Sequence, residues 1–481
     1  MTDFMKTKMR GLSRREMLKS GAAVVGGLAA VSAFPFASAA RAADKPASLN
    51  MLYATSEADS DAIKAALPDF KAAMGFDINL DTMPYDALQQ KVFAELASGS
   101  AHYDVMIVDT PWMPALTNKI APITDMVLDS STSADLDLTD FIPKVFFDTA
   151  VYKGDESHRH FAKTDVIDAA AIKAGGFDIY GLPMQANVLT MAYRTDLFDD
   201  PANQKAFKAK HGKDLAIPGT WDEFTVVAEF FTDAGKRQWG TTLMAGAGDW
   251  ATDDFKSLLA GFGGDGHLVG DNFDVAFDSP EGLAALSYYV ELIQTKKVTP
   301  PGTTSASWDN VATSFSNGLT AMTMNYHDLS LSPTVKGGLV AYAVIPSGRG
   351  LGPHFGTWML SVNSFSANKE WAYQAIKWFT SSATQIKALQ HQLHPTRISV
   401  YQAALKDAGL TTKFANFYDV LGKSLAVGVG RPRLTNYGDV DRAVWVAVNN
   451  AARGAAKPAE ALKTAAAQVR DLLKQAGYKP N

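Results

Sequence analysis

The chain has 481 residues, of which 47% are hydrophobic and 20% charged, with a formal net charge of −5 and no cysteine. This is about twice the length that one hydrophobic core usually reaches, so we expect at least two domains. The lack of cysteine excludes disulfides, cysteine-ligated zinc or iron–sulfur clusters, a cysteine nucleophile and a lipidated N-terminal cysteine.

The N-terminal segment has the features of an export signal. Residues 13–19 carry a twin-arginine pattern, and an uncharged stretch rich in Gly and Ala follows at 20–40. Small residues offer cleavage after Ala39 or Ala42, so we interpret residues 1–42 as a signal peptide and expect a periplasmic protein. An uncleaved anchor is the alternative, although Gly and Ala contribute little transfer energy.

The remaining chain is acidic. Without residues 1–42 it keeps 38 basic and 48 acidic residues, a net charge of −10, so neither nucleic acid nor an anionic membrane surface is an expected partner. No cofactor is expected either, because no G-x-G-x-x-G motif follows a strand and no haem motif occurs. The pairs His158/His160 and His391/His394 have spacings found in metal sites, but a third ligand is missing, so no metal is expected.

The first part of the mature chain alternates between strands and helices. Strands are predicted at 49–54, 76–80 and 103–108, with a helix after each of the first two; Gly99 ends the second helix. This β-α-β-α-β order indicates a parallel sheet, whose ligands bind beyond the carboxyl ends of the strands. The loops at those ends are 53–59, 82–86 and 109–112.

Asp109 and Trp112 stand out in the last of these loops. A carboxylate accepts bonds from sugar hydroxyls and an indole covers the apolar face of a pyranose, so the pair fits a carbohydrate site. The alternative is that Trp112 packs under the loop and Asp109 caps the next helix.

Later segments follow the same rules. Thr220 and Glu223 form a capping box, and Ser279 before Pro280 begins another helix. A helix is expected at 306–317 and a strand at 319–326. Helical spacing predicts that the tryptophans at 308, 371 and 378 belong to the core.

Short motifs follow one another in a characteristic order along nearly the whole mature chain. They are residues 103–109 with Trp112, 180–187, 193–198, 220–224, 315–322, 356–358 and 395–397. In this order and spacing they resemble the carbohydrate-binding group (family 1 type) of the extracellular solute-binding proteins of ABC importers.

The resemblance implies an α/β fold: a two-lobed periplasmic binding protein fold, type II-like. Each lobe would be a mostly parallel sheet flanked by helices, and the chain would cross the hinge three times, near 185–189, 355–358 and 427–432. One lobe would then comprise 44–186 plus 357–427, and the other 187–356 plus 428–481.

The resemblance also implies a function. The chain would be the periplasmic substrate-binding component of an ABC transporter, not an enzyme, and would capture a carbohydrate (sugar, glycoside or polyol) by hinge closure. Its expected partners are that small ligand and an ABC permease in the inner membrane, and we expect a monomer.

Candidate ligand-binding residues come from the ends of strands, the expected crossings and a Gly-rich loop. They are Tyr53, Glu57, Asp109, Trp112, Gln185, Asn187, Asp249, Trp250, Tyr326, Asp328, Trp358 and Arg397. Trp358 is the preferred stacking residue. The alternative for Gln185 and Asn187 is a backbone-bonding role in the hinge, and the alternative for Arg397 is an interlobe salt bridge.

Three other functions remain compatible with parts of the sequence. An exported carbohydrate-active enzyme (glycosidase or lyase) needs two carboxylates, which Asp109 and Asp249 could supply. A redox enzyme exported by the twin-arginine route is disfavoured by the missing cofactor motifs. A subunit that presents its closed form to a receptor kinase has the same sequence requirements as a transport protein.

Overall fold

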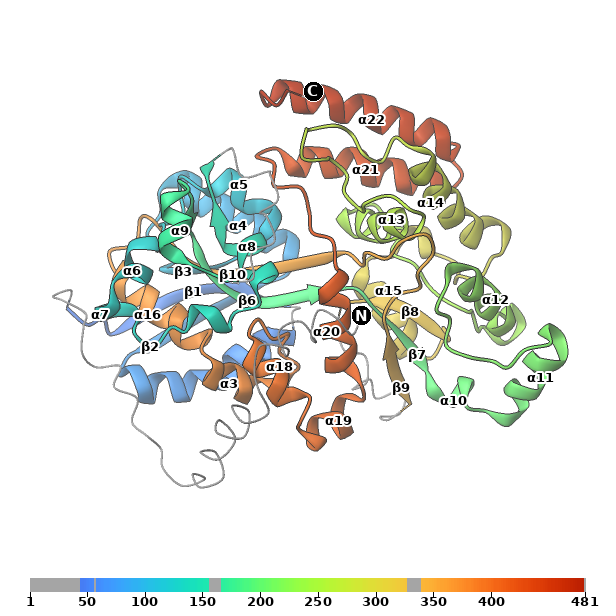
Figure 1. Cartoon of the computed structure of the whole chain (residues 1–481), viewed down its shortest axis with the longest axis horizontal. Helices are drawn as coiled ribbons and strands as arrows, with labels where there is room; N and C mark the ends of the chain where they lie inside the picture. The colour runs from blue at the N-terminus through green and yellow to red at the C-terminus, as the bar shows by residue number, and fades with distance from the viewer. Residues whose placement is uncertain (1–43, 56–57, 155–165, 327–338, 480–481) are drawn as a thin grey trace, which may run out of the picture. The chain divides into compact units, whose positions relative to one another are not determined.

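The computed structural model describes residues 44–55, 58–154, 166–326 and 339–479 (Figure 1). The predicted signal peptide at 1–42 lies outside these ranges with both cleavage sites, as do Glu57, His158, His160 and Asp328. Within the described ranges, no helix has the length and apolar character needed to cross a bilayer.

Five strands form the larger sheet, in the order β2-β1-β3-β10-β6. They are β1 (Ser48–Ala54), β2 (Asp77–Met83), β3 (Val105–Asp109), β6 (Gly181–Val188) and β10 (Phe355–Val362). β1 pairs in parallel with β2 and β3, whereas β10 is antiparallel to β3 and β6. Strands β3, β6 and β10 are buried throughout, as expected for a sheet covered on both faces. The predicted parallel β-α-β-α-β unit is confirmed.

Four main helices pack against this sheet. They are α3 (Ala58–Met74), α4 (Tyr85–Ser98), α8 (Pro143–Ala150) and α16 (Lys369–Phe379). Gly99 ends α4 as predicted, with a φ of 69° that favours glycine. Trp378 of α16 is buried, but Trp371 is only half-buried, 5.7 Å from the ring of Phe76.

Further elements complete this part of the chain. The helices are α5 (Met113–Leu116), α6 (Thr124–Leu128), α7 (Ser130–Ser133), α9 (Ala169–Ala174), α17 (Ser382–Ala388), α18 (Ile398–Ala404), α19 (Ala408–Phe414) and α20 (Phe417–Val427). Strands β4 (Val151–Tyr152) and β5 (Asp178–Ile179) form a separate antiparallel pair.

The second sheet differs from the prediction. It has the order β8-β7-β9, with β7 (Thr190–Arg194) antiparallel to both β8 (Met322–Asn325) and β9 (Val340–Ala343). The expectation of a mostly parallel sheet is therefore wrong for this lobe. Strands β8 and β9 both run opposite to β7 and lie on either side of it, so the two strands that share a direction are not neighbours.

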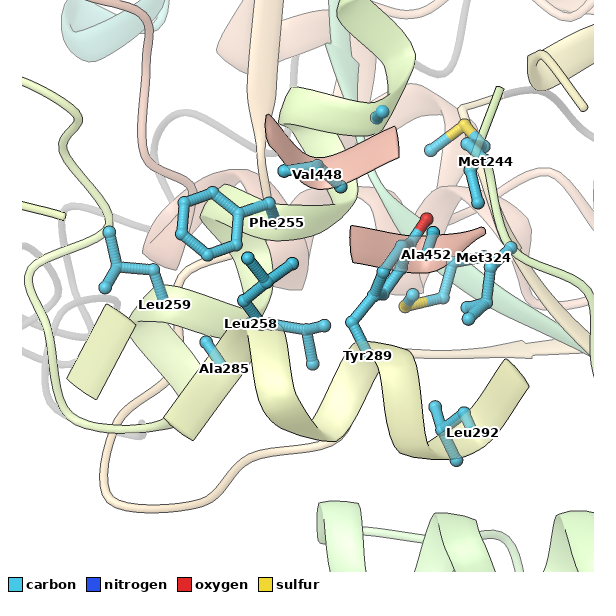
Figure 2. Close-up of a cluster of buried hydrophobic side chains, with 14 of the residues drawn as sticks. Met244, Phe255, Leu258, Leu259, Ala285, Tyr289, Leu292, Met324, Val448 and Ala452 are labelled. Atoms are coloured by element: carbon cyan, nitrogen blue, oxygen red, sulfur yellow. The ribbon is translucent and has the colours of Figure 1, made fainter. Parts of the chain in front are cut away.

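A layer of helices accompanies this second sheet. It consists of α10 (Thr195–Phe198), α11 (Pro201–His211), α12 (Trp221–Phe231), α13 (Asp249–Gly261), α14 (Pro280–Val290), α15 (Trp308–Ser316), α21 (Tyr437–Ala452) and α22 (Pro458–Gln475). The Thr220 capping box and the Ser279 N-cap are confirmed. Figure 2 shows how α13, α14 and α21 meet: Phe255, Tyr289 and Val448 share one buried hydrophobic cluster.

Within the described ranges, the chain passes between the two sheets at three places. Leu189 alone separates β6 from β7 (Figure 1), residues 344–354 lead from β9 to β10, and residues 428–436 lead from α20 to α21. A second hydrophobic cluster joins side chains from β6, β7, β9, β10 and α20 at these passages. The predicted crossing at 355–358 lies inside β10, just after the passage; the assignment of residues to lobes stays a prediction.

Candidate functional site

Three of the predicted site residues lie in one row across the larger sheet. Trp358 in β10 pairs with Asp109 in β3 on one side and with Gln185 in β6 on the other. Residues directly opposite each other in antiparallel strands point to the same face of the sheet. The register therefore places a carboxylate, an indole and an amide side by side.

Gln185 and Asn187 make a short polar pair at the edge of this row. Both are buried in β6, and Gln185 Nε2 donates a hydrogen bond to Asn187 Oδ1 at 3.1 Å. Asn187 itself lies opposite Gly356 of β10. The bond between the two amides orients their remaining polar atoms.

Five aromatic side chains form what we call the aromatic cluster: Tyr85, Trp112, Trp250, Trp308 and Trp358. The ring of Tyr85 lies 5.4 Å from Trp112, 5.6 Å from Trp358 and 5.5 Å from Trp308. Trp308 lies 5.1 Å from Trp250. These spacings suit edge-to-face packing. The cluster thus joins Trp358 of β10, Tyr85 of α4 and Trp112 of the turn after β3 to rings of α13 and α15.

Trp308 was predicted to be buried, which is wrong. The structure leaves it half-buried against Tyr85 and Trp250. Trp308 is the first residue of α15, and the buried face of this helix begins later, at Val311. Helical spacing alone did not separate these two positions.

Arg431 bridges two aspartates that come from different elements. Its Nη1 lies 3.5 Å from Asp109 Oδ2, and its Nη2 lies 3.6 Å from Asp253 Oδ2 in α13. Tyr85 donates its hydroxyl to the same Asp109 oxygen at 2.9 Å. Gly356 allows the guanidinium to approach β10, since a Cβ there would lie 3.0 Å from Nη1.

Asp253 also belongs to a buried group with Tyr326 and His354. The Tyr326 hydroxyl donates to Asp253 Oδ2 at 2.7 Å and is hydrogen-bonded to His354 Nδ1. His354 Nε2 lies 3.1 Å from the other oxygen of Asp253. Burial, followed by the charges of Lys256 and Arg431, holds the pKa of His354 well below its usual range, so the imidazole is neutral at pH 7.

Asp249, the first residue of α13, has a different environment. It is half-buried, and its carboxylate makes no hydrogen bond or ion pair with the described residues. Burial raises its pKa well above the usual range, and Asp441 and Asp253 raise it further, while Arg431 opposes them. Asp441 of α21 accepts a bond from Tyr437 at 3.3 Å, and burial raises its pKa to about 6.

Two predicted residues lie apart from these contacts. Tyr53 is fully buried in β1, where it pairs with Thr82 of β2. Arg397 is fully buried at the start of α18. Its guanidinium donates to the carbonyl oxygens of Leu136, Asp137 and Thr380, lies 3.6 Å from Asp140, and covers the ring of Phe141. The proposed ligand contact or interlobe salt bridge of Arg397 is therefore replaced by contacts that tie α18 to the chain around 136–141.

The sequence reasoning missed several residues of the site. Tyr85, the first residue of α4, lies in the segment 82–86 that was predicted to be a strand-end loop, so a signal for it existed. Arg431 lies in the expected third crossing, where an arginine between Gly430 and Pro432 could have been noticed. Asp253 and His354 carried no signal, because one lies in the middle of a helix and the other in an irregular connection.

Comparison with known families gives one match that covers most of the chain. A family profile described as bacterial extracellular solute-binding protein matches residues 54–386. A similar curated sequence is a probable amino-acid ABC transporter periplasmic-binding protein of Sinorhizobium fredii, 24% identical over 472 residues, which cover 94% of this chain and 98% of the relative. An erythritol/L-threitol-binding protein of Mycolicibacterium smegmatis is 23% identical over 357 residues, 71% of this chain and 68% of that protein.

Solved structures show the same fold. Maltose-bound MalE3 of T. maritima superposes with a TM-score of 0.72 at 24% identity, covering 89% of this chain and 100% of that one. An ABC transporter solute-binding protein of Agrobacterium radiobacter in complex with ribitol gives a TM-score of 0.71 at 25% identity, covering 89% and 99%. The two-lobed fold expected from the sequence is confirmed.

Proposed function

Because the chain belongs to the family of bacterial extracellular solute-binding proteins, we propose that it captures a sugar or polyol and delivers it to an ABC permease. Proteins of the same fold are described with maltose, ribitol and D-mannitol, and one relative is named for erythritol and L-threitol. The observation that carries the proposal is the row of Asp109, Trp358 and Gln185, continued by the aromatic cluster. Such a surface offers hydrogen-bonding groups for hydroxyls and flat faces for C–H groups.

The energetics favour closure of two half-sites. Micromolar affinity corresponds to about −8 kcal/mol, whereas one net hydrogen bond contributes only about 1 kcal/mol. An aromatic face that buries on the order of 100 Å² adds about 2.5 kcal/mol. Several contacts must therefore form together, and Asp109 with Trp358 on the larger sheet and Asp249 with Trp250 on α13 could close around one ligand.

We assign 44–186 plus 357–427 to one lobe and 187–356 plus 428–481 to the other. The twin-arginine pattern supports export to the periplasm, where the protein would act as a monomer. No chemical step is proposed, so the ligand should leave the protein unchanged.

A ligand screen with two readouts tests this function. Purified protein is heated with a panel of sugars and polyols, and ligands that raise Tm are measured by titration calorimetry and recovered for mass spectrometry. We expect stabilisation by at least one compound, which is recovered intact, and a smaller radius of gyration in X-ray scattering. Stabilisation by none of the panel, or consumption of the compound, would contradict the proposal.

A pair of tryptophan variants localises the binding surface. Trp358→Leu removes a ring from the centre of the row, so the affinity for the best compound should fall at least about tenfold. Trp371→Leu is the matched control, because this tryptophan packs against Phe76 beside the outer strand β2. An equal loss in both variants would show that the row is not the site.

A further inference from the structure

The cations around the candidate site are already bonded to protein groups. Arg431 bridges Asp109 and Asp253, and Lys256 Nζ donates to the carbonyl oxygen of Gly430. Arg433 donates to the carbonyl oxygens of Phe147 and Val151 and covers the ring of Tyr152. An anionic group entering here would have to displace one of these contacts to find a positive partner.

Negative charge, in contrast, is in excess. Asp109, Asp249, Asp253 and Asp441 lie close enough to influence one another's ionisation. Asp109 and Asp249 also both act on the phenol of Tyr85, although one aspartate ends β3 and the other begins α13. Asp249 is the carboxylate of this group that has no bonding partner among the described residues.

The aromatic cluster also requires a hydrogen-bond acceptor. Trp112 is only 2% exposed, and its indole Nε1–H is buried without an acceptor among the residues that the structure describes; the same holds for the Nε1–H of Trp250. A buried donor of this kind costs free energy until an acceptor reaches it. A hydroxyl can accept from an indole and donate to a carboxylate at the same time, whereas an ionised carboxylate can only accept.

We infer that the site selects uncharged polyhydroxy compounds over the corresponding sugar acids, and that Asp249 is the residue that sets this discrimination. The inference rests on the proposed function and narrows its ligand class. An anionic group placed beside Asp249 would add to the negative charge of the neighbouring aspartates, which already raises the pKa of Asp249, so it would bind either against like charge or with a proton held on Asp249. The nearby cations could not offset this cost, because they are already bonded to protein groups. We expect sugar acids to bind at least about tenfold more weakly than their neutral counterparts, which corresponds to about 1.4 kcal/mol.

Titration calorimetry with matched pairs tests the inference. The probes are ribitol and ribonate, mannitol and mannonate, and glucose and glucuronate, which differ within each pair by one oxidised carbon. The measured quantity is the ratio of the acid's Kd to the neutral compound's Kd. In the unmodified protein this ratio should be at least about 10, and in Asp249→Asn it should fall several-fold, because the amide carries no charge and can donate to the acid.

Asp222→Asn is the control variant. Asp222 is exposed and also lies in the first turn of a helix, α12, so its replacement has a comparable effect on a helix N-terminus without touching the site. The ratio should stay unchanged in this variant.

The possible failures are distinguishable. Equal binding of acid and neutral compound by the unmodified protein would overturn the inference while the proposed function stands. An unchanged ratio in Asp249→Asn would overturn the role of Asp249. Absence of binding by all six compounds, together with no stabilisation by any sugar or polyol of the wider panel, would contradict the proposed function and, with it, the inference.

Discussion

Arg431 offers the sharpest test of the charge arrangement described above. Its side chain is buried and is the cation that neutralises both Asp109 and Asp253. Replacement by methionine keeps much of the side-chain volume but removes the charge. Two carboxylates would then be left in the interior without their shared counterion.

The distances give the size of the effect. Separations of 3.5 and 3.6 Å correspond to about 5 kcal/mol of attraction for each pair at an effective dielectric constant of about 20. The cost of burying the guanidinium offsets a large part of this sum. Because loss of one partner of a buried pair usually costs about 3–5 kcal/mol, we expect Arg431→Met to lower the free energy of unfolding by that amount at pH 7.5.

The loss should depend on pH in a defined direction. Burial raises the pKa of Asp253, and Arg431 lowers it. Without Arg431 the effect of burial is opposed by fewer groups, so the pKa of Asp253 rises further in the folded state. An acid with a raised folded-state pKa favours folding as the pH falls. The difference between Arg431→Met and the unmodified protein should therefore shrink between pH 7.5 and 5.

Urea denaturation followed by tryptophan fluorescence measures these differences. Arg442→Met is the control, since Arg442 is exposed on α21 and its loss should change stability by less than about 0.5 kcal/mol. The triple variant Asp109→Asn, Asp253→Asn, Arg431→Met should regain most of the loss, because positions 109 and 253 then carry no charge that needs Arg431. Equal stabilities of Arg431→Met and Arg442→Met, or no recovery in the triple variant, would refute this reasoning.

Three further predictions concern single residues. Arg397→Met should lower the free energy of unfolding by about 3–5 kcal/mol, because it removes the donor to three backbone carbonyls and the cation beside Asp140, which keeps only its bonds from Ser382 and Ser399. Calorimetry should show an unchanged ligand Kd, and a tenfold weaker Kd would place Arg397 in the site after all. Trp250→Ala should weaken binding of the best ligand by about 10- to 100-fold, because one aromatic face is lost. Tm should change little because the ring is half-buried; a large drop in Tm with unchanged Kd would contradict this. Burial raises the pKa of Asp254 to about 7, so this acid stabilises the fold at low pH and loses that contribution as the pH rises from about 4 to 7. The urea midpoint of Asp254→Asn should therefore fall less over this range than that of the unmodified protein. Parallel profiles of midpoint against pH would exclude the effect.

The larger sheet was predictable because local pattern and long-range structure agree there. Strands β1, β2 and β3 are hydrophobic runs separated by amphipathic helices, so their order already specifies a parallel unit. Strands β7, β8 and β9 have four or five residues each, and 127 residues lie between β7 and β8. Their antiparallel pairing depends on tertiary contacts that no local pattern contains.

In the candidate site, too, single residues were predictable from the sequence but their arrangement was not. Asp109, Gln185 and Trp358 were recognised singly, as polar or aromatic residues near strand ends. Their common row follows from the register of β10, which only the structure provides. Asp253 could not be found, because polar residues in α13 suggest a solvent-facing side whereas neighbouring elements enclose nearly the whole helix.

Arg397 illustrates the opposite error. Arginine near the end of a family motif suggested a role toward ligand, yet its planar guanidinium suits several backbone carbonyls equally well. Residue type therefore indicated a polar role but not the partner.

The position of β10 inside the larger sheet has a consequence for how the protein is made. β10 separates β3 from β6, yet it is encoded more than 160 residues after β6. A nascent chain that stops short of residue 355 leaves a gap between these strands and holds Asp109 and Gln185 without the tryptophan between them. Strand insertion over such sequence distances is slow and leaves open edges on the way. An immobilised ligand would thus retain finished molecules during synthesis but not chains that end before residue 355.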